Sequence, residues 1–196
     1  AIAGDLADVA NPVPLEVQVV VLDSYLDRLS EQAVVLAGSG NHDLDGPDAQ
    51  GEQAAGWLSQ LDLPGVAVDG ATVELDGSLV TVCPWWDGPL GRSRVVEQLA
   101  RDASRGVRPW IWVYHWPPPD LPVSWTGRQT YGDADLAEWI DRFQPSLVLS
   151  GHVHQSPWVA GGSWIASSGA TWIINAGRQI GPTPSHAVVD LDAWSA

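Results

Sequence analysis

The sequence predicts an α/β fold in a single domain. Short apolar runs alternate with amphipathic stretches along the chain, which is typical of a layered mixed fold. The 196 residues fit one domain, and no repeat, low-complexity tract or linker divides them, so we expect one domain over residues 1–196. Hydrophobic residues make up 45% of the chain and charged residues 17%, which is enough apolar material for a buried core and excludes intrinsic disorder.

The order of apolar and amphipathic segments predicts the elements. The apolar runs expected to form strands are Ala1–Ala3, Ala33–Leu36, Val66–Val68, Thr72–Leu75, Leu79–Val82, Trp110–Tyr114, Leu147–Leu149, Trp172–Asn175 and Ala187–Leu191. Asp76-Gly77 predicts a hairpin turn. The amphipathic segments expected to form helices are Leu15–Leu29, Ala49–Leu61, Ser93–Arg105 and Ala134–Phe143. Asp133 is a predicted N-cap and Gly106 a predicted C′ residue. Pro117–Pro122 is too rich in proline for a strand and predicts a surface loop.

The charge balance limits the classes of molecule that this protein can bind. Nine basic and 24 acidic residues give a net charge of −15, which repels nucleic acid and anionic membranes. No apolar run reaches the roughly 18 residues that a membrane-spanning helix needs. A single cysteine, Cys83, excludes an internal disulfide framework. All basic residues are arginine, which indicates a GC-rich genome or adaptation to high salt. We expect a cytoplasmic bacterial protein, and the oligomeric state stays open.

Polar side chains follow apolar strands at several points. Gly40-Asn41-His42-Asp43 follows one predicted strand, His115 ends another, and Gly151-His152-Val153-His154 follows a third. Gly4-Asp5-Leu6-Ala7-Asp8 follows the opening apolar triplet in the same way. Because loops beyond the carboxyl ends of strands converge in open α/β sheets, we expect these residues to share one site.

The residue types in these loops favour metal binding. Imidazole, carboxylate and amide oxygen together suit divalent Mn, Fe, Co, Ni or Zn. In an extended segment His152 and His154 would lie about 7 Å apart on one face. That separation suits two ions roughly 3.5–4 Å apart better than one. A carboxylate such as Asp5 has two oxygens and can bridge two ions. No site for an organic cofactor is predicted.

These motifs, in this order, resemble the calcineurin-like metallophosphoesterase superfamily between residues 4 and 154. The resemblance implies a four-layer α/β/β/α sandwich with a dinuclear metal site. It implies that Asp5 bridges the two metals, that Asn41, His115 and His152 complete one metal site, and that His154 binds the other metal.

The resemblance also implies the chemistry. A metal-bridging hydroxide would hydrolyse a small phosphomonoester or phosphodiester, and His42 would assist the leaving oxygen. Asp8 would hold the other ring nitrogen of His42 and favour its protonated form. Asp43 receives no direct role.

One element of the superfamily is absent from the sequence. The superfamily begins with an Asp-x-His motif after its first strand, and only three residues precede Gly4. Without that motif, one metal retains only Asp5 and His154 from this chain. The chain opens on Ala1-Ile2-Ala3, which resembles the middle of a strand, and contains no methionine. We therefore expect an N-terminal segment, including the first strand, to be missing.

Two alternatives to this phosphoesterase function remain. The first is a catalytically silent module that keeps the sandwich and binds partner proteins, which the missing motif favours. The second is a nuclease of the same superfamily, against which the lack of a basic track argues.

Several residues allow more than one interpretation. The tryptophans near the motif loops form an aromatic wall for substrate or pack in the ordinary way: Trp85, Trp86, Trp116, Trp125 and Trp158. Arg128 and Arg178 contact phosphate oxygens or remain solvated. His186 matches no motif, and we expect it to be structural.

Overall fold

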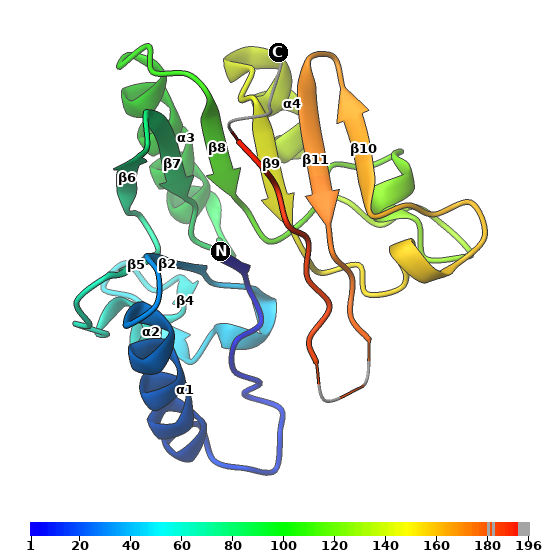
Figure 1. Cartoon of the computed structure of the whole chain (residues 1–196). Helices are drawn as coiled ribbons and strands as arrows, with labels where there is room; N and C mark the ends of the chain where they lie inside the picture. The colour runs from blue at the N-terminus through cyan, green and yellow to red at the C-terminus, as the bar shows by residue number, and fades with distance from the viewer. Residues whose placement is uncertain (180, 182, 192–196) are drawn as a thin grey trace.

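The computed structural model describes residues 1–179, 181 and 183–191, and the described residues form two facing sheets with helices outside them (Figure 1). The strands are β1 (Ile2–Ala3), β2 (Val35–Gly38), β3 (Gly46–Pro47), β4 (Gln53–Ala54), β5 (Val66–Val68), β6 (Thr72–Leu75), β7 (Ser78–Val82), β8 (Trp110–Val113), β9 (Leu147–Ser150), β10 (Ile165–Ser168) and β11 (Thr171–Asn175). The helices are α1 (Leu15–Ser30), α2 (Gly56–Ser59), α3 (Pro89–Ala103) and α4 (Ala134–Phe143), with 3₁₀ turns at Asn41–Asp43, Pro122–Ser124 and Ser156–Trp158.

The larger sheet has the strand order β10-β11-β9-β8-β7-β6 and the smaller one β1-β2-β5. In the larger sheet β7, β8, β9 and β11 run parallel, and the two edge strands run antiparallel to their neighbours. The smaller sheet is parallel throughout. The carboxyl ends of the parallel strands within each sheet therefore lie at one edge, where the loops that follow them begin.

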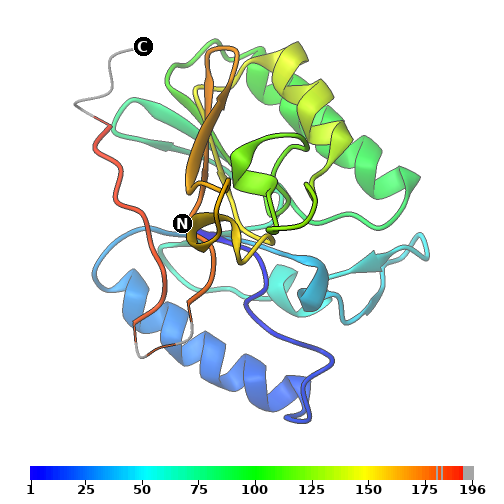
Figure 2. The ribbon, with the colours of Figure 1, turned by 90° about the vertical axis from the view of Figure 1, so that its right-hand side faces the viewer.

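Alternation along the strands creates two cores, one on each face of the larger sheet. In β8, Trp110 and Trp112 face α3 and α4, whereas Ile111 and Val113 face the smaller sheet. α1 covers the outer side of the smaller sheet, with Val19 packed in the same cluster as Val68 of β5. Figure 2 shows α1 and the α3–α4 pair on opposite sides of the two sheets. This arrangement confirms the predicted four-layer α/β/β/α sandwich.

Elements with a strong local signal match their predictions closely. α4 spans the predicted residues, and Asp133 caps it by accepting a hydrogen bond from the Asp135 N–H (2.9 Å). β5 and β6 also have the predicted bounds. The turn between β6 and β7 has positive φ at Asp76 (47°) and Gly77 (80°), as a tight hairpin requires.

The predicted helix Ala49–Leu61 is wrong. Most of it is occupied by the β3–β4 hairpin and loops, and only the short α2 is helical. Side chains compete with a helix for the backbone here. The Asp48 carboxylate accepts from the N–H groups of residues 50 and 52, and Asp45 accepts from those of residues 56 and 57. These hydrogen bonds stabilise turns, so within the predicted range only the short α2 is helical.

The predicted strand Ala187–Leu191 is also wrong, because these residues make no ladder with the described strands. Val189 packs against the core between the sheets, whereas Val188 is 88% exposed. The apolar pattern reflects this one-sided packing. The segment lines a cavity of about 780 Å³ between the sheets, together with residues such as Val80 and Ile174. The edge strand β10 escaped prediction because two of its four residues are serines.

Among the described residues, no helix combines the length and apolar character needed to cross a membrane.

Candidate metal centre

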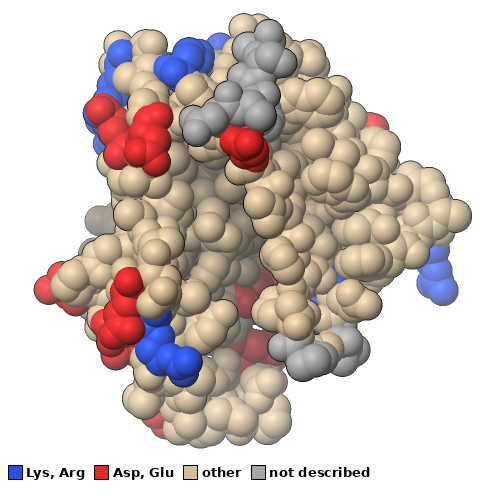
Figure 3. Space-filling view, viewed as in Figure 1, with Lys and Arg blue, Asp and Glu red and all other residues tan. Residues whose placement is uncertain are grey.

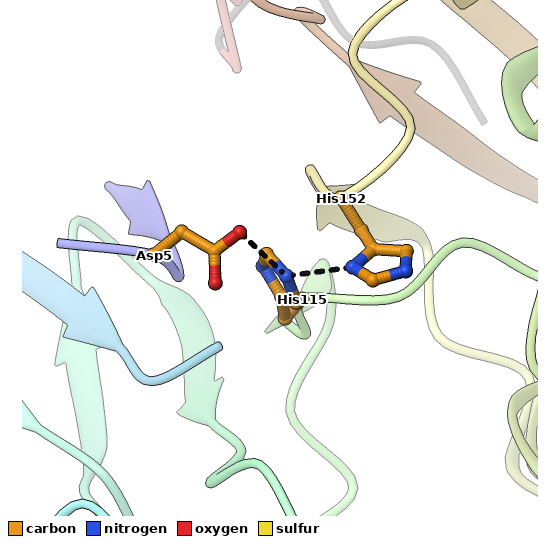
Figure 4. A group of neighbouring side chains, drawn as sticks. All are labelled: Asp5, His115 and His152. Atoms are coloured by element: carbon orange, nitrogen blue, oxygen red, sulfur yellow. Dashed lines mark hydrogen bonds and ion pairs between the residues drawn. The ribbon is translucent and has the colours of Figure 1, made fainter. Parts of the chain in front are cut away.

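Segments that follow four strands bring the predicted site residues toward one another. Asp5 comes after β1, Asn41 and His42 after β2, His115 after β8 and His152 after β9. Figure 4 shows the side chains of Asp5, His115 and His152 converging from three separate segments. The convergence predicted for these loops is therefore present for these three residues.

The donor atoms of this group are close enough to share one ion. His115 Nε2 lies 3.3 Å from Asp5 Oδ2, 3.0 Å from His152 Nδ1 and 3.2 Å from Asn41 Oδ1. The three atoms from Asp5, His115 and His152 all lie within 4.8 Å of one another. Ligand atoms at about 2.0–2.2 Å from an ion are typically about 3 Å apart, which matches these separations.

The hydrogen bonding of His115 tests whether a cation fits. His115 Nδ1 lies 2.6 Å from the Ala3 carbonyl oxygen, which only accepts, so Nδ1 carries the proton. In a neutral ring, Nε2 then directs its lone pair toward the oxygens of Asp5 and Asn41. Several acceptors facing one another require positive charge between them. Nitrogen and oxygen donors in this arrangement fit a divalent transition-metal ion.

Charge and burial set the protonation states around this point. Burial alone would raise the pKa of Asp5, but its interactions with His115 and His42 lower it below the ordinary value. Burial, followed by the charge of His115, lowers the pKa of His152 to about 4. At neutral pH Asp5 is thus ionised and His152 is neutral, which are the forms that bind a metal.

Close backbone packing fixes the positions of the candidate ligands Asp5 and His115. A Cβ on Gly40 would lie 2.3 Å from Asp5 Oδ1 and 2.8 Å from His115 Cε1. A Cβ on Gly4, whose φ is +93°, would lie 2.2 Å from His115 Nδ1. Only glycine permits the loops after β1 and β2 to approach His115 so closely. Asp5 (φ 56°) and His152 (φ 60°) themselves adopt left-handed backbone conformations.

Asp43, for which no direct role is predicted from the sequence, holds two site loops together. Its buried carboxylate accepts hydrogen bonds from the N–H groups of Leu6 (3.2 Å), Ala7 (2.6 Å) and Gly40 (2.8 Å). The loop after β1 is thereby tied to the loop after β2. The position of an acidic residue directly after His42 was the only signal for this role.

His42 and Asp8 form a pair beside the donor group. His42 Nδ1 lies 3.1 Å from Asp8 Oδ1, and the His42 backbone N–H donates to Asp5 Oδ1 (3.1 Å). The hydrogen bond to Asp8 is the main reason that the pKa of His42 is raised. The same bond lowers the pKa of Asp8. The geometry suits a proton donor held next to the candidate metal ligands.

His154 lies outside the group of three donors. Its carbonyl oxygen accepts a hydrogen bond from the Arg178 N–H (3.0 Å). Burial, followed by the charge of Arg178, lowers the pKa of His154. Its assignment to a second ion therefore stays a prediction.

The tryptophans named from the sequence divide into two sets. Trp85 and Trp116 contact the ring of His152, and Tyr131, which the sequence did not single out, contacts it as well. The other three lie in other places: Trp86 packs against the α3–α4 core, Trp125 donates to the Ala160 carbonyl, and Trp158 is 56% exposed.

The remaining cationic and histidine residues lie on the surface. The side chains of Arg128 and Arg178 are exposed, as is His186. His186 Nδ1 lies 3.1 Å from the Pro184 carbonyl oxygen and is remote in sequence from the motif loops.

Comparisons with known proteins identify the fold and the family. A solved structure with 18% sequence identity covers 81% of this chain with a TM-score of 0.58, and this chain spans 63% of its length. The crystal structure of TT1561 of Thermus thermophilus has 17% identity and a TM-score of 0.56, with 89% of this chain and 74% of that chain covered. Both show the same fold. A search of curated proteins finds no match. The family model for calcineurin-like phosphoesterases matches residues 1–156, which contain every donor described above. The chain belongs to the calcineurin-like phosphoesterase family.

Proposed function

We propose that this protein is a phosphoesterase that uses two divalent metal ions to hydrolyse small phosphomonoesters or phosphodiesters. The observation that carries the proposal is the convergence of Asp5, His115 and His152 donor atoms within 4.8 Å. Membership of a family of phosphoesterases supports the reaction class.

The chain's own residues have distinct tasks in this reaction. Asp5, Asn41, His115 and His152 would hold one ion, and Asp5 and His154 would hold the other. Bound divalent ions supply an activated water at neutral pH and neutralise charge on the phosphate oxygens. His42 donates a proton to the departing oxygen, and Asp8 keeps the ring of His42 oriented and protonated.

The charge distribution favours a small substrate over a polynucleotide. The chain carries a net charge of −15. On the described part of the face in Figure 3, basic side chains lie in separate places and form no continuous track. A small ester needs only the local positive charge of the ions, whereas a nucleic acid needs an extended basic surface.

The test combines metal content with hydrolysis. The purified protein is loaded separately with Mn, Zn, Co, Ni or Fe ions and assayed with 4-nitrophenyl phosphate and bis(4-nitrophenyl) phosphate. We expect metal-dependent hydrolysis of at least one of them. The His152→Ala variant should lose both bound metal and activity, whereas His186→Ala, which removes an exposed histidine, should keep both.

Two results would contradict the proposal. A protein that binds metal but hydrolyses no phosphomonoester or phosphodiester would be a silent binding module. Salt-sensitive DNA binding with DNA cleavage would indicate a nuclease instead.

A further inference from the structure

The two ligand histidines are held in different ways. The His115 ring is oriented by the hydrogen bond between Nδ1 and the Ala3 carbonyl oxygen (2.6 Å). In metal-binding histidines the N–H of the second ring nitrogen usually donates a hydrogen bond to such an oxygen, which fixes both the tautomer and the orientation of the ring. His152 Nδ1 lies 3.0 Å from His115 Nε2, but its other nitrogen has no hydrogen-bond partner among the described residues. The His152 ring therefore lacks the second-nitrogen hydrogen bond that orients His115.

Three aromatic side chains surround that ring. The His152 ring is nearly parallel to Tyr131 (centroids 5.2 Å apart, interplanar angle 24°) and to Trp85 (6.0 Å, 27°). Trp116 lies 5.1 Å from it at 52°. We call Trp85, Trp116 and Tyr131 the aromatic cluster. Rings packed at these distances restrict rotation of the imidazole.

The cluster is itself anchored from several elements. The Trp85 backbone N–H donates to Ser39 Oγ (2.8 Å), in the loop after β2. Trp116 Nε1 donates to the Tyr131 carbonyl oxygen (3.3 Å), which joins two members of the cluster. Trp85 and Trp116 also stack on one another, with centroids 5.5 Å apart at 26°.

The position of Tyr131 depends on its neighbour Gly132. A Cβ on Gly132 would lie 2.5 Å from Pro119 N and 2.6 Å from the carbonyl carbon of Pro118. The chain therefore passes directly against the proline-rich loop that follows Trp116. This contact places Tyr131 next to Trp116 (5.2 Å between centroids).

We propose that the aromatic cluster is the positioning element for His152, replacing the hydrogen bond that orients His115. The cluster holds the imidazole so that Nδ1 faces His115 and Asp5 before an ion arrives. The members are positioning residues: they act on the ion through His152. The relevance of this role to catalysis rests on the proposed function, but the geometry of the ring does not.

The first test measures ion affinity. Mn²⁺ binding is titrated calorimetrically with wild-type protein, Tyr131→Ala and Tyr131→Phe. We expect Tyr131→Ala to weaken affinity by about 10-fold or more, the scale seen when groups that orient a ligand are removed. Tyr131→Phe keeps the ring and should stay close to wild type. Trp158→Ala removes an exposed tryptophan without a ring contact to His152 and should also leave affinity unchanged.

The second test needs no ion. In metal-free protein, proton NMR should show contacts from the His152 ring to the rings of Trp85, Trp116 and Tyr131, consistent with one rotamer. In Tyr131→Ala the ring should average over several rotamers, while the signals of His115 stay sharp. Thermal unfolding of each variant shows whether the fold is intact.

The outcomes separate this inference from the proposed function. Wild-type affinity in Tyr131→Ala, or a His152 ring that already averages over rotamers in wild-type protein, would overturn the inference and leave the phosphoesterase proposal standing. A normal affinity combined with lower turnover would assign the cluster to substrate and would also overturn it. A wild-type protein that shows both positioning effects but hydrolyses no ester would refute only the proposed function.

Discussion

His42 and Asp8 are joined side chain to side chain, with Nδ1 of the imidazole 3.1 Å from Oδ1 of the carboxylate. Both side chains are almost half exposed, at 46% and 44%. The hydrogen bond raises the pKa of His42, so the ring keeps its proton to a higher pH than an ordinary histidine. The backbone N–H of His42 also donates to Asp5 Oδ1 (3.1 Å), which places this pair beside Asp5.

Replacing His42 should separate metal binding from turnover. In His42→Asn the donor atoms of Asp5, His115 and His152 remain, so bound metal should stay at the wild-type level. Turnover should fall by about 10²–10⁴-fold, the usual contribution of a general acid. Steady-state kinetics and metal analysis of the same preparation check this. Turnover equal to wild type would refute the assigned role.

Removing the partner of His42 should change its titration. In Asp8→Asn the main cause of the raised pKa is lost, so the pKa of His42 should fall toward its ordinary value of 6.5. The variant ring then loses its proton at lower pH, and the alkaline limb of the activity profile should move toward acid pH. An NMR titration of His42 in metal-free protein measures the shift directly. An unchanged titration would show that Asp8 does not control this ring.

Asp43 should matter for stability as well as for the site. The Asp43 carboxylate accepts hydrogen bonds from three backbone N–H groups. In Asp43→Asn an amide NH₂ replaces one of the accepting oxygens, so at least one buried N–H loses its acceptor. We expect a loss of about 1–3 kcal/mol in the free energy of unfolding. Urea denaturation measures it, with Asp62→Asn at an exposed site as the control. Equal losses in the two variants would argue against the tie between the loops.

Adding one methyl group at Gly40 should disrupt the metal centre. The new Cβ would lie 2.3 Å from Asp5 Oδ1, so the carboxylate has to move away from its present position. Mn²⁺ affinity in Gly40→Ala should fall by about 10-fold or more, an effect comparable to loss of a group that orients a ligand. Gly46→Ala is the matched control, because a Cβ there meets nothing within 4 Å. Calorimetric titration that finds both variants alike would contradict this packing argument.

The buried carboxyl group of Asp69 should make the stability of the folded protein depend on pH, whether or not a metal ion is bound. Burial is the main cause that raises the pKa of Asp69 from 3.8 to about 7. Between these two values the unfolded chain releases a proton that the folded protein keeps, so this carboxyl makes stability fall as pH rises. Its contribution has a slope of up to about 1.4 kcal/mol per pH unit.

Asp69→Asn should abolish that contribution. The stability of the variant relative to wild type should therefore increase between about pH 4 and pH 7 in metal-free protein. Because Ser39 N–H donates to Asp69 Oδ1 (2.8 Å), the substitution also changes a hydrogen bond, and the informative quantity is the change with pH. A constant difference across this interval would show that Asp69 titrates normally.

Local signals explain which elements the sequence predicts. α4 carries its own cap at Asp133, and the β6–β7 hairpin carries its own turn at Asp76 and Gly77, so neither depends on distant residues. The segment after Asp48 is amphipathic enough for a helix, but the Asp48 carboxylate accepts hydrogen bonds from backbone N–H groups there, and the segment forms turns instead. Such competition between side chain and helix is invisible in hydrophobic periodicity.

In the candidate site, too, residues with a local sequence signal are predictable and the others are not. The donors Asp5, His115 and His152 stand directly after strands, and parallel pairing makes their convergence predictable. The aromatic cluster has no comparable signal. Tyr131 lies against His152 where Gly132 packs against the backbone of the proline-rich loop, a contact between segments that no local pattern encodes.

The donors come from both sheets of the sandwich: Asp5 adjoins the smaller sheet, and His115 and His152 adjoin the larger one. An ion coordinated by all three would be a reversible cross-link between strands far apart in the chain. Because such an ion would have no comparable site in the unfolded polypeptide, its binding would raise the free energy of unfolding, by about 4 kcal/mol when free ion exceeds its dissociation constant roughly 1,000-fold. Chelators would therefore weaken the architecture of this protein along with its chemistry.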